Sequence, residues 1–209
     1  VIDLPRWKWQ PILQLIILST RPFRSGRNYA SIWNRELNES PLMTITRSQS
    51  EKLAARLKTE LGDQVVVDFC MRYGNPSTES KVKDMIAQGC QKILFFPLYP
   101  HYAGATSATA IDQFFRVLMN EVWQPATRVV APYYDDPGFI APLAASVTTA
   151  YQALDRQPDV LVASYHGMPQ RYLTQGDPYY CQCMKTSRLL VDALGWVPDQ
   201  LVTSFQSKF

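Results

Sequence analysis

Four short apolar runs, each followed by a segment of helix length, constrain the fold of this chain more than any other feature. The runs are rich in β-branched and aromatic residues and cover 65–73, 92–100, 127–134 and 159–167. Runs of this kind are typical of strands in a parallel sheet with helices on both faces. The segments between and after them predict helices over 77–89, 107–122, 138–154 and 182–194. This alternation indicates βαβ units and an α/β fold.

Polar and aromatic residues gather where these predicted strands end. They are Arg72 and Tyr73, the run 99–102, Tyr133 and Tyr134, and the run 164–166. In open parallel sheets, ligands bind beyond the carboxyl ends of the strands. We therefore expect the chemistry of this protein at one edge of the sheet. A further alternating run at 201–205 predicts another strand close to the last residue.

Composition and motifs exclude several classes of function. The net charge is only +3 in 209 residues, without a basic run or a nucleic-acid motif, so we expect no nucleic-acid partner. No strand is followed by a glycine-rich phosphate loop, which argues against a dehydrogenase or a nucleoside triphosphatase. Of the four cysteines, Cys181 and Cys183 are close in sequence but lack the second pair of ligands that a zinc site needs. We expect reduced thiols and no structural metal.

The most apolar segment, 11–18, is far shorter than the roughly 20 residues that span a bilayer. Trp7, Lys8 and Trp9 precede it and are residue types that anchor a segment at a membrane surface. Two interpretations stay open: contact with a membrane through 7–18, or a helix packed on its own domain. The chain starts with Val1 and stops directly after a predicted strand, so we expect that both ends of the protein are missing.

The segment 161–183, LVASYHGMPQRYLTQGDPYYCQC, is the most unusual in the chain. It places His166 at the end of a buried strand, on a turn made by Gly167 and Pro169. An imidazole there can accept protons near neutral pH or bind a metal. A single histidine can equally have a structural role, so the residue types alone leave both interpretations open.

This segment resembles the ferrochelatase signature, in which a strand ends in Ser-x-His-[GS]-x-Pro and Gly-Asp-x-Tyr follows after a short gap. The matching residues are Ser164, His166, Gly167, Pro169, Gly176, Asp177 and Tyr179. The flanks match in the same order, at 40–41, 72–73, 97–102 and 204–209. The resemblance covers the whole chain and points to a bacterial-type member. It implies a chelatase-like fold of two Rossmann-like, doubly wound domains with four-stranded parallel sheets, here incomplete, divided into 1–137 and 138–209.

The resemblance also implies an activity. Ferrochelatases are lyases that insert ferrous iron, as a substrate, into protoporphyrin IX in the last step of heme biosynthesis. In this family the histidine that matches His166 is the proton acceptor or the metal ligand. We expect a cytoplasmic enzyme, with a peripheral place on the inner membrane as an option. Because the family's carboxylate-bearing second half is absent, we expect residues 1–209 to be inactive alone.

The resemblance assigns further residues to the porphyrin site. It places Ile2 at the lip of the pocket, in contact with the porphyrin, and Arg21 where it can bind a propionate group of the porphyrin. The remaining matches line the pocket: Tyr29, Ser40, Tyr102, Ser164 and Ser207. Simple packing would explain Ile2 and Tyr29 equally well, and Arg21 could be a solvated cation. His101 stands where relatives have histidine or glutamine, so it can assist but is not essential to the class.

Other functions remain as alternatives. Some ferrochelatases bind a [2Fe-2S] cluster through a cysteine that Gly104 replaces here, so we expect no iron-sulfur cluster. A cobalt chelatase of the same fold would act on a corrinoid precursor, but usually presents paired histidines and lacks the GDPYYCQC run. A non-catalytic carrier would bind heme or porphyrin without inserting metal. A doubly wound domain with an unrelated small ligand is the last alternative.

Overall fold

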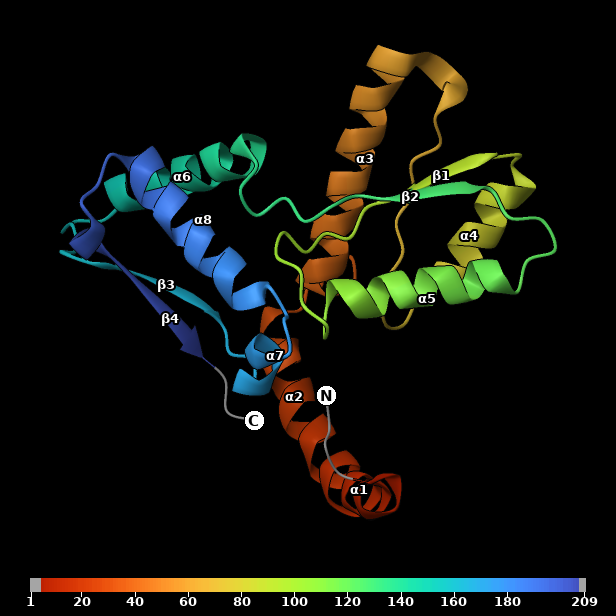
Figure 1. The fold of residues 1–209 in the computed structure, drawn as a ribbon, viewed down its shortest axis with the longest axis horizontal. Helices are drawn as coiled ribbons and strands as arrows, with labels where there is room; N and C mark the ends of the chain where they lie inside the picture. Colours follow the sequence, from red (N-terminus) through yellow and green to blue (C-terminus); the bar gives the residue numbers. More distant parts are fainter. Residues whose placement is uncertain (1–4, 207–209) are drawn as a thin grey trace. The chain divides into compact units, whose positions relative to one another are not determined.

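The computed structural model describes residues 5–206, except for the side chains of Arg6, Thr20, Arg21 and Arg24. The chain forms two compact units, Val1–Cys90 and Gln91–Phe209, and each is treated by itself (Figure 1).

A long helical run opens the first unit. It consists of α1 (Arg6–Ile12), a π-helical turn (Leu13–Ile17) and α2 (Leu18–Ile32). Pro11 and Pro22 lie inside the two α-helices and cannot donate to the backbone ladder. The π-helical turn directly follows the α1 proline, as expected where the regular hydrogen-bond pattern is interrupted. Residues 11–18 are helical, and the choice between membrane contact and packing on the domain stays open.

Local capping residues set the bounds of the next helices. The Ser40 hydroxyl accepts a hydrogen bond from Met43 N at 3.2 Å and starts α3 (Pro41–Leu61). Gly62 ends α3 with a φ of 70°, which disfavours other residues, and leads into a short 3-10 turn (Gly62–Gln64). The Ser77 hydroxyl caps α4 (Thr78–Ala87) in the same way as Ser40 caps α3.

The strand predicted over 65–73 is wrong. This segment is not part of either sheet. Its described β-type pairing is an isolated bridge between Met71 and Ser77. A strand exists only where a neighbour pairs with its backbone, and none of the described strands pairs with this segment. Val65 and Val66 accordingly remain partly exposed. The apolar run favoured a buried strand, but the pairing partner is absent from the described residues.

The second unit contains a first parallel strand pair with one helix packed on it. Strand β1 (Lys92–Phe95) pairs with β2 (Ala126–Val129), in register from Lys92 opposite Ala126. Helix α5 (Ser107–Met119) connects them and buries Phe114 fully, with its ring stacked on Phe95 at 4.5 Å between centroids. Both strands end earlier than predicted, because Pro97 and Pro132 follow and lack the N–H that a strand donates.

The second strand pair carries the signature segment. Strand β3 (Leu161–His166) pairs in parallel with β4 (Leu201–Gln206), with His166 opposite Gln206. Helices α6 (Pro137–Gln152) and α8 (Tyr179–Leu194) lie on the same face of this pair (Figure 1). Their shared core consists of Ala144, Leu190, Val191 and Leu201. Helix α7 (Gln170–Thr174) follows β3, and a 3-10 turn (Pro198–Gln200) precedes β4.

The α/β class is confirmed, as are the four predicted helices and four of the five predicted strands. Each sheet has two strands among the described residues, where a complete domain of the expected fold has four. The predicted domain boundary at 137/138 falls between the two strand pairs and stays a prediction.

The core between α6, α8 and β4 generates the first prediction. Leu190 is 4% exposed in this core, whereas Leu154, just after α6, is 52% exposed. We expect Leu190→Ala to lower the free energy of unfolding by about 2–5 kcal/mol, because it removes buried methyl groups and leaves a cavity. Leu154→Ala removes the same atoms from a solvated site and should cost about 0.5 kcal/mol or less. Urea unfolding of both variants measures the difference, and equal losses would contradict this core.

Candidate active site

His166 is the last residue of β3 and lies on the face of the sheet opposite α8. Side chains alternate along β3, so Leu161, Ala163 and Tyr165 face the α6–α8 core. Val162, Ser164 and His166 point to the other face and are exposed. The structure therefore brings the predicted residues Ser164 and His166 together on one face of β3. Ser204 and Gln206 of β4 stand opposite them in register.

The backbone around His166 is held by several hydrogen bonds. Gly167 N donates to Gln206 O at 2.8 Å, which extends the pairing of β3 and β4 by one residue. The backbone of His166 also hydrogen-bonds with the hydroxyl of Tyr179, from the first turn of α8. The Tyr165 and Ser187 hydroxyls lie 3.1 Å apart and link β3 to the middle of α8. The end of the strand is therefore fixed before any ligand binds.

Burial gives the groups behind His166 a fixed protonation state. It raises the pKa of Tyr179 to about 12, with a further contribution from Cys183. It also raises the pKa of the Cys183 thiol to about 11. Both side chains remain protonated near neutral pH. They support the strand end as neutral hydrogen-bonding groups and supply no charge to the site.

The Gly-Asp pair of the signature has a structural role in this fold. Gly176 has a φ of 92°, which side-chain-bearing residues rarely adopt, and it lets the chain turn from α7 toward α8. Asp177 then caps α8, because its Oδ1 accepts from Tyr179 N at 3.0 Å. Its other oxygen, Oδ2, accepts from Gly104 N at 2.7 Å. One carboxylate thus starts α8 and binds the loop after β1.

Two further side chains of α8 bind the same loop. Gln182 Oε1 accepts a hydrogen bond from Tyr102 N at 2.7 Å. The Thr186 hydroxyl lies 2.8 Å from His101 Nε2 and 2.8 Å from Tyr134 O. Both Gln182 and Thr186 are buried. Together with Asp177 they fasten the segment 101–104 to the first two turns of α8.

His101 is a neutral, half-buried imidazole in this arrangement. Burial lowers its pKa to about 4. Its ring lies among those of Tyr134, Phe139, Tyr165 and Tyr179, with centroids 5.6–6.4 Å away. An imidazole with this pKa is neutral near pH 7 and does not act as a base there, although its ring keeps one N–H that can donate a hydrogen bond. His101 therefore contributes hydrogen bonding and packing.

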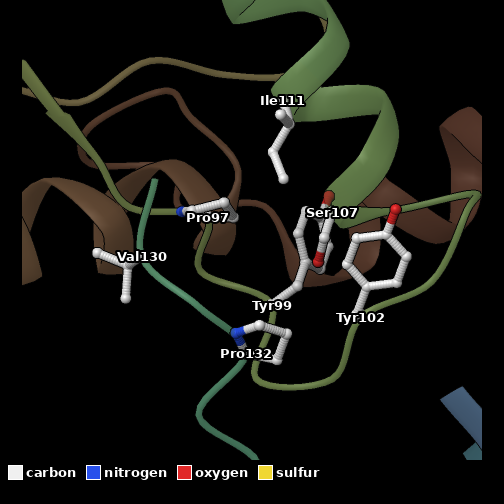
Figure 2. A pocket seen from close by; sticks show the side chains of 7 residues that line it. All are labelled: Pro97, Tyr99, Tyr102, Ser107, Ile111, Val130 and Pro132. Carbon is white, nitrogen blue, oxygen red and sulfur yellow. The ribbon is translucent and has the colours of Figure 1, made fainter. Parts of the chain in front are cut away.

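Two hollows lie near these elements. Figure 2 shows the first, where Tyr99 and Tyr102 of the loop after β1 meet Ser107 and Ile111 of α5; Pro97, Val130 and Pro132 complete it. The second adjoins the turn after His166 and is open to solvent. Its lining consists of the run 167–170 together with Tyr172, Leu173, Asp177, Tyr179, Tyr180 and Phe205. The two hollows share no lining residue, so the structure does not place Tyr102 in the same hollow as the signature turn.

The other predicted site residues belong to the first unit or lie outside the described residues. Ile2 and Ser207 are outside the described residues, and the side chain of Arg21 in α2 is not described. Tyr29, also in α2, is 57% exposed. Ser40 is half-buried, and its oxygen is used to cap α3.

All four cysteines, which lie within the described residues, are free thiols in the structure. Cys181 is exposed and Cys183 is buried, although they are two residues apart on α8. Over residues 5–206, no cluster of three or more histidine, cysteine, aspartate or glutamate side chains is arranged to hold a metal ion.

Sequence reasoning missed Gln182 and Thr186. Both belong to the helix that follows the signature, and their spacing of four residues places them on one face of α8. Polar residues at a helical spacing among buried ones were the available signal. Their partners, about 80 residues earlier in the chain, gave no local sign.

The neutral state of His101 generates a prediction on acid stability. Its pKa in the folded chain, about 4, is below the ordinary value of 6.5, so the unfolded chain binds the proton more readily between these values. Stability from this group is complete above about pH 6.5 and is lost as the pH falls toward 4. Glutamine can donate to Thr186 without titrating. We therefore expect the unfolding free energy of His101→Gln to fall less than that of the wild type between pH 7.5 and pH 4.5.

Urea unfolding over this pH range measures the effect, and the comparison at pH 7.5 shows what the substitution costs without protonation. Parallel curves for the two proteins would contradict a neutral, buried His101.

Comparison with known proteins gives a match that includes the signature segment 161–183. The family model of ferrochelatase matches residues 1–209. The chain is similar to the ferrochelatase of Rhodobacter capsulatus, with 66% identity over 210 residues. It is 53% identical to the ferrochelatase of Mesorhizobium japonicum and 51% identical to that of Rhizobium etli, each over 209 residues.

These alignments cover 100% of this chain and 59–60% of the relatives, so the chain spans about three fifths of their length. The family match extends over every element described above, including β3, the turn after His166 and α8. On these grounds the chain belongs to the ferrochelatase family.

Proposed function

We propose that the protein is a metal-chelatase lyase that inserts ferrous iron into protoporphyrin IX and so forms heme. The observation that carries this proposal is the position of His166, exposed at the carboxyl end of β3 within a strand end fixed by Gly167 and Tyr179. Membership of the ferrochelatase family supports the choice of porphyrin and iron as substrates.

The reaction requires a base or a metal ligand at this place. Fe²⁺ replaces two N–H protons of the porphyrin, so one ferrous ion and one porphyrin give heme and two protons. The imidazole of His166 can accept these protons one after the other and pass them to water. It can alternatively hold the incoming ion through a ring nitrogen. Both roles need the same side-chain position at the carboxyl end of β3.

The fixed strand end supports a second requirement of the reaction. A planar porphyrin must be distorted before its nitrogen lone pairs meet the metal, and only a rigid wall can impose that distortion. Asp177, Gln182 and Thr186 fasten the loop after β1 to α8, and Tyr179 fastens α8 to His166. These buried bonds give the site the stiffness that distortion requires.

The remaining predicted residues are proposed as porphyrin contacts. Ser164 stands two residues before His166 on the same face and can reach the same ligand. Ser40 accepts from Met43 N, and its own proton stays available for a substrate oxygen. Arg21 is suited to a propionate by charge-assisted hydrogen bonding. We keep Ile2, Tyr29, Tyr102 and Ser207 as further lining residues, and 1–137 and 138–209 as the two domains.

We also propose that the protein works without an iron-sulfur cluster and that residues 1–209 alone do not sustain turnover. Gly104 occupies the position of the cluster cysteine in cluster-bearing relatives. A Cβ atom there would lie 3.3 Å from the Tyr172 ring and 3.4 Å from Asp177 Oδ2, so a side chain would crowd the loop. The second proposal rests on the chain's share of its relatives' length.

We propose a cytoplasmic enzyme that touches the inner membrane through residues 7–18. Among the described residues, no helix has both the length and the apolar character to cross a bilayer. The helical run nevertheless exposes several large apolar side chains, among them Trp7, Leu15, Ile16 and Phe23. Lys8 lies 5.0 Å from the ring of Trp7 and adds a positive charge. Apolar and basic side chains on one exposed helix favour an interfacial position.

Metal insertion tests the proposed function. The polypeptide encoded by the complete natural gene is incubated anaerobically with protoporphyrin IX and Fe²⁺, and loss of the porphyrin absorbance is followed. We expect His166→Ala to lower the rate by about 100-fold or more, since it removes a positioned acid-base group. Val162→Ala changes an exposed residue on the same face of β3, four positions earlier, and should keep the rate.

Equal rates for His166→Ala and the wild type would remove His166 from the centre of the reaction. Tight porphyrin binding without metal insertion by the wild type would favour a carrier, and preference for cobalt and a corrinoid precursor would favour a cobalt chelatase.

Vesicle binding tests the membrane contact. We expect the double variant Leu15→Glu, Ile16→Glu to lose cosedimentation with anionic phospholipid vesicles, because two charges would enter the apolar boundary. Leu37→Glu alters another exposed leucine of the same unit, outside the helical run, and should bind like the wild type. Equal binding of all three proteins, or no binding by the wild type, would contradict a contact through 7–18.

A further inference from the structure

His101 lies where four elements of the second unit meet. Its ring is stacked on Tyr134, which follows β2, at 6.3 Å between centroids. It makes edge contacts with Phe139 of α6, Tyr165 of β3 and Tyr179 of α8, at 6.4, 5.6 and 6.0 Å. A small displacement of this ring would therefore be transmitted to β3 and α8 together, because closely packed side chains leave little room to adjust.

The hydrogen bonds of Thr186 fix which nitrogen of His101 carries the proton. A threonine hydroxyl has one proton to donate and can also accept. Thr186 Oγ1 donates toward Tyr134 O at 2.8 Å and toward Gln182 O at 3.2 Å. Its contact with His101 Nε2, at 2.8 Å, is therefore one in which the imidazole N–H donates. This bond orients the ring, and Thr186 is only 1% exposed, so water does not compete for it.

Of the three tyrosines that contact His101, Tyr165 and Tyr179 also hold the end of the strand that carries His166. Tyr165 immediately precedes His166 in β3 and points to the α8 side, where its hydroxyl meets Ser187. Tyr179 hydrogen-bonds with the His166 backbone. His101 thus contacts both the ring of Tyr165, which precedes His166 in β3, and the ring of Tyr179, which hydrogen-bonds with the His166 backbone.

We propose that His101 is a positioning residue for the reaction at His166: its oriented imidazole holds Tyr165 and Tyr179, and these set the place of the His166 side chain. This inference rests on the proposed metal insertion for its catalytic consequence, but the placement of His166 can be measured without activity.

The proposal distinguishes two kinds of substitution. Glutamine keeps an N–H donor at about the reach of Nε2, so His101→Gln preserves the bond to Thr186. Leucine keeps apolar bulk but has no donor, so His101→Leu leaves the Thr186 hydroxyl without its imidazole partner and the ring contacts without orientation. The contrast between these variants separates oriented support from simple filling of space.

The experiment uses the polypeptide encoded by the complete natural gene, with ¹⁵N-labelled histidine. His166 imidazole resonances are assigned with a His166 variant, and their chemical shifts and titration are followed by NMR. We expect them to move in His101→Leu and to remain near the wild type in His101→Gln. In the metal-insertion assay, His101→Leu should lower kcat about 10-fold, as loss of a supporting partner does elsewhere, while His101→Gln stays within about 2-fold.

Tyr151→Phe is the matched control. The Tyr151 hydroxyl of α6 bonds to Pro158 O, before β3 and far along the strand from His166. Its loss removes one side-chain hydrogen bond from the same unit and should move neither the His166 resonances nor kcat. His166 resonances and kcat that are the same in folded His101→Leu as in Tyr151→Phe would overturn the proposal, as would equal effects of leucine and glutamine.

A second pair of variants covers a failure of His101→Leu to fold. Thr186→Ser keeps the hydroxyl and Thr186→Val removes it with little change of shape. We expect the valine variant to shift the His166 resonances and the serine variant to preserve them, and equal spectra would overturn the proposal. If the wild type inserts no metal, the proposed function fails, whereas the NMR comparison still decides whether His101 positions His166.

Discussion

The arrangement of the second unit depends on the hydrogen bonds made by the buried hydroxyl of Thr186. It donates to Tyr134 O at the end of the β1–β2 part and accepts from His101 of the loop after β1. Its own backbone belongs to α8, which packs with α6 on β3 and β4. One side chain thus joins both strand pairs of the unit. A buried hydroxyl without a hydrogen-bond partner would lower the free energy of unfolding by about 1–3 kcal/mol. The Thr186 hydroxyl has partners in both His101 and Tyr134.

The signature segment divides its work between frame and chemistry. Gly176 permits the turn, Asp177 starts α8 and binds Gly104, and Tyr179 holds the strand end. All three act through backbone conformation and hydrogen bonds around the end of β3 and the start of α8, and none of these contacts requires a substrate. The residue that carries the proposed chemistry is therefore surrounded by neighbours whose contribution is geometric.

Local patterns predicted the elements of this fold and failed where distant partners decide. The runs at 92–100 and 159–167 contained strands because their own residues favour strands. Pro97 after β1 and Pro132 after β2 marked the ends of those strands more accurately than the apolar pattern did. The run 65–73 has the same pattern and forms no strand among the described residues, since pairing depends on a neighbour. Likewise, His166 was found from its turn, but the bond between Tyr102 N and Gln182 spans 80 positions and leaves no trace in either segment.

The chain has two histidines, and their surroundings assign them different tasks. His101 is enclosed by four aromatic rings, bonded through Nε2 to Thr186, and kept neutral by burial that lowers its pKa to about 4. A base for pyrrole protons must take up a proton near neutral pH, and the lowered pKa of His101 does not suit it to that task. His166 lies at the carboxyl end of β3, on the face opposite α6 and α8. Histidine therefore serves as a support at His101, on the α8 side of β3, and as the proposed reactive group at His166, on the opposite face.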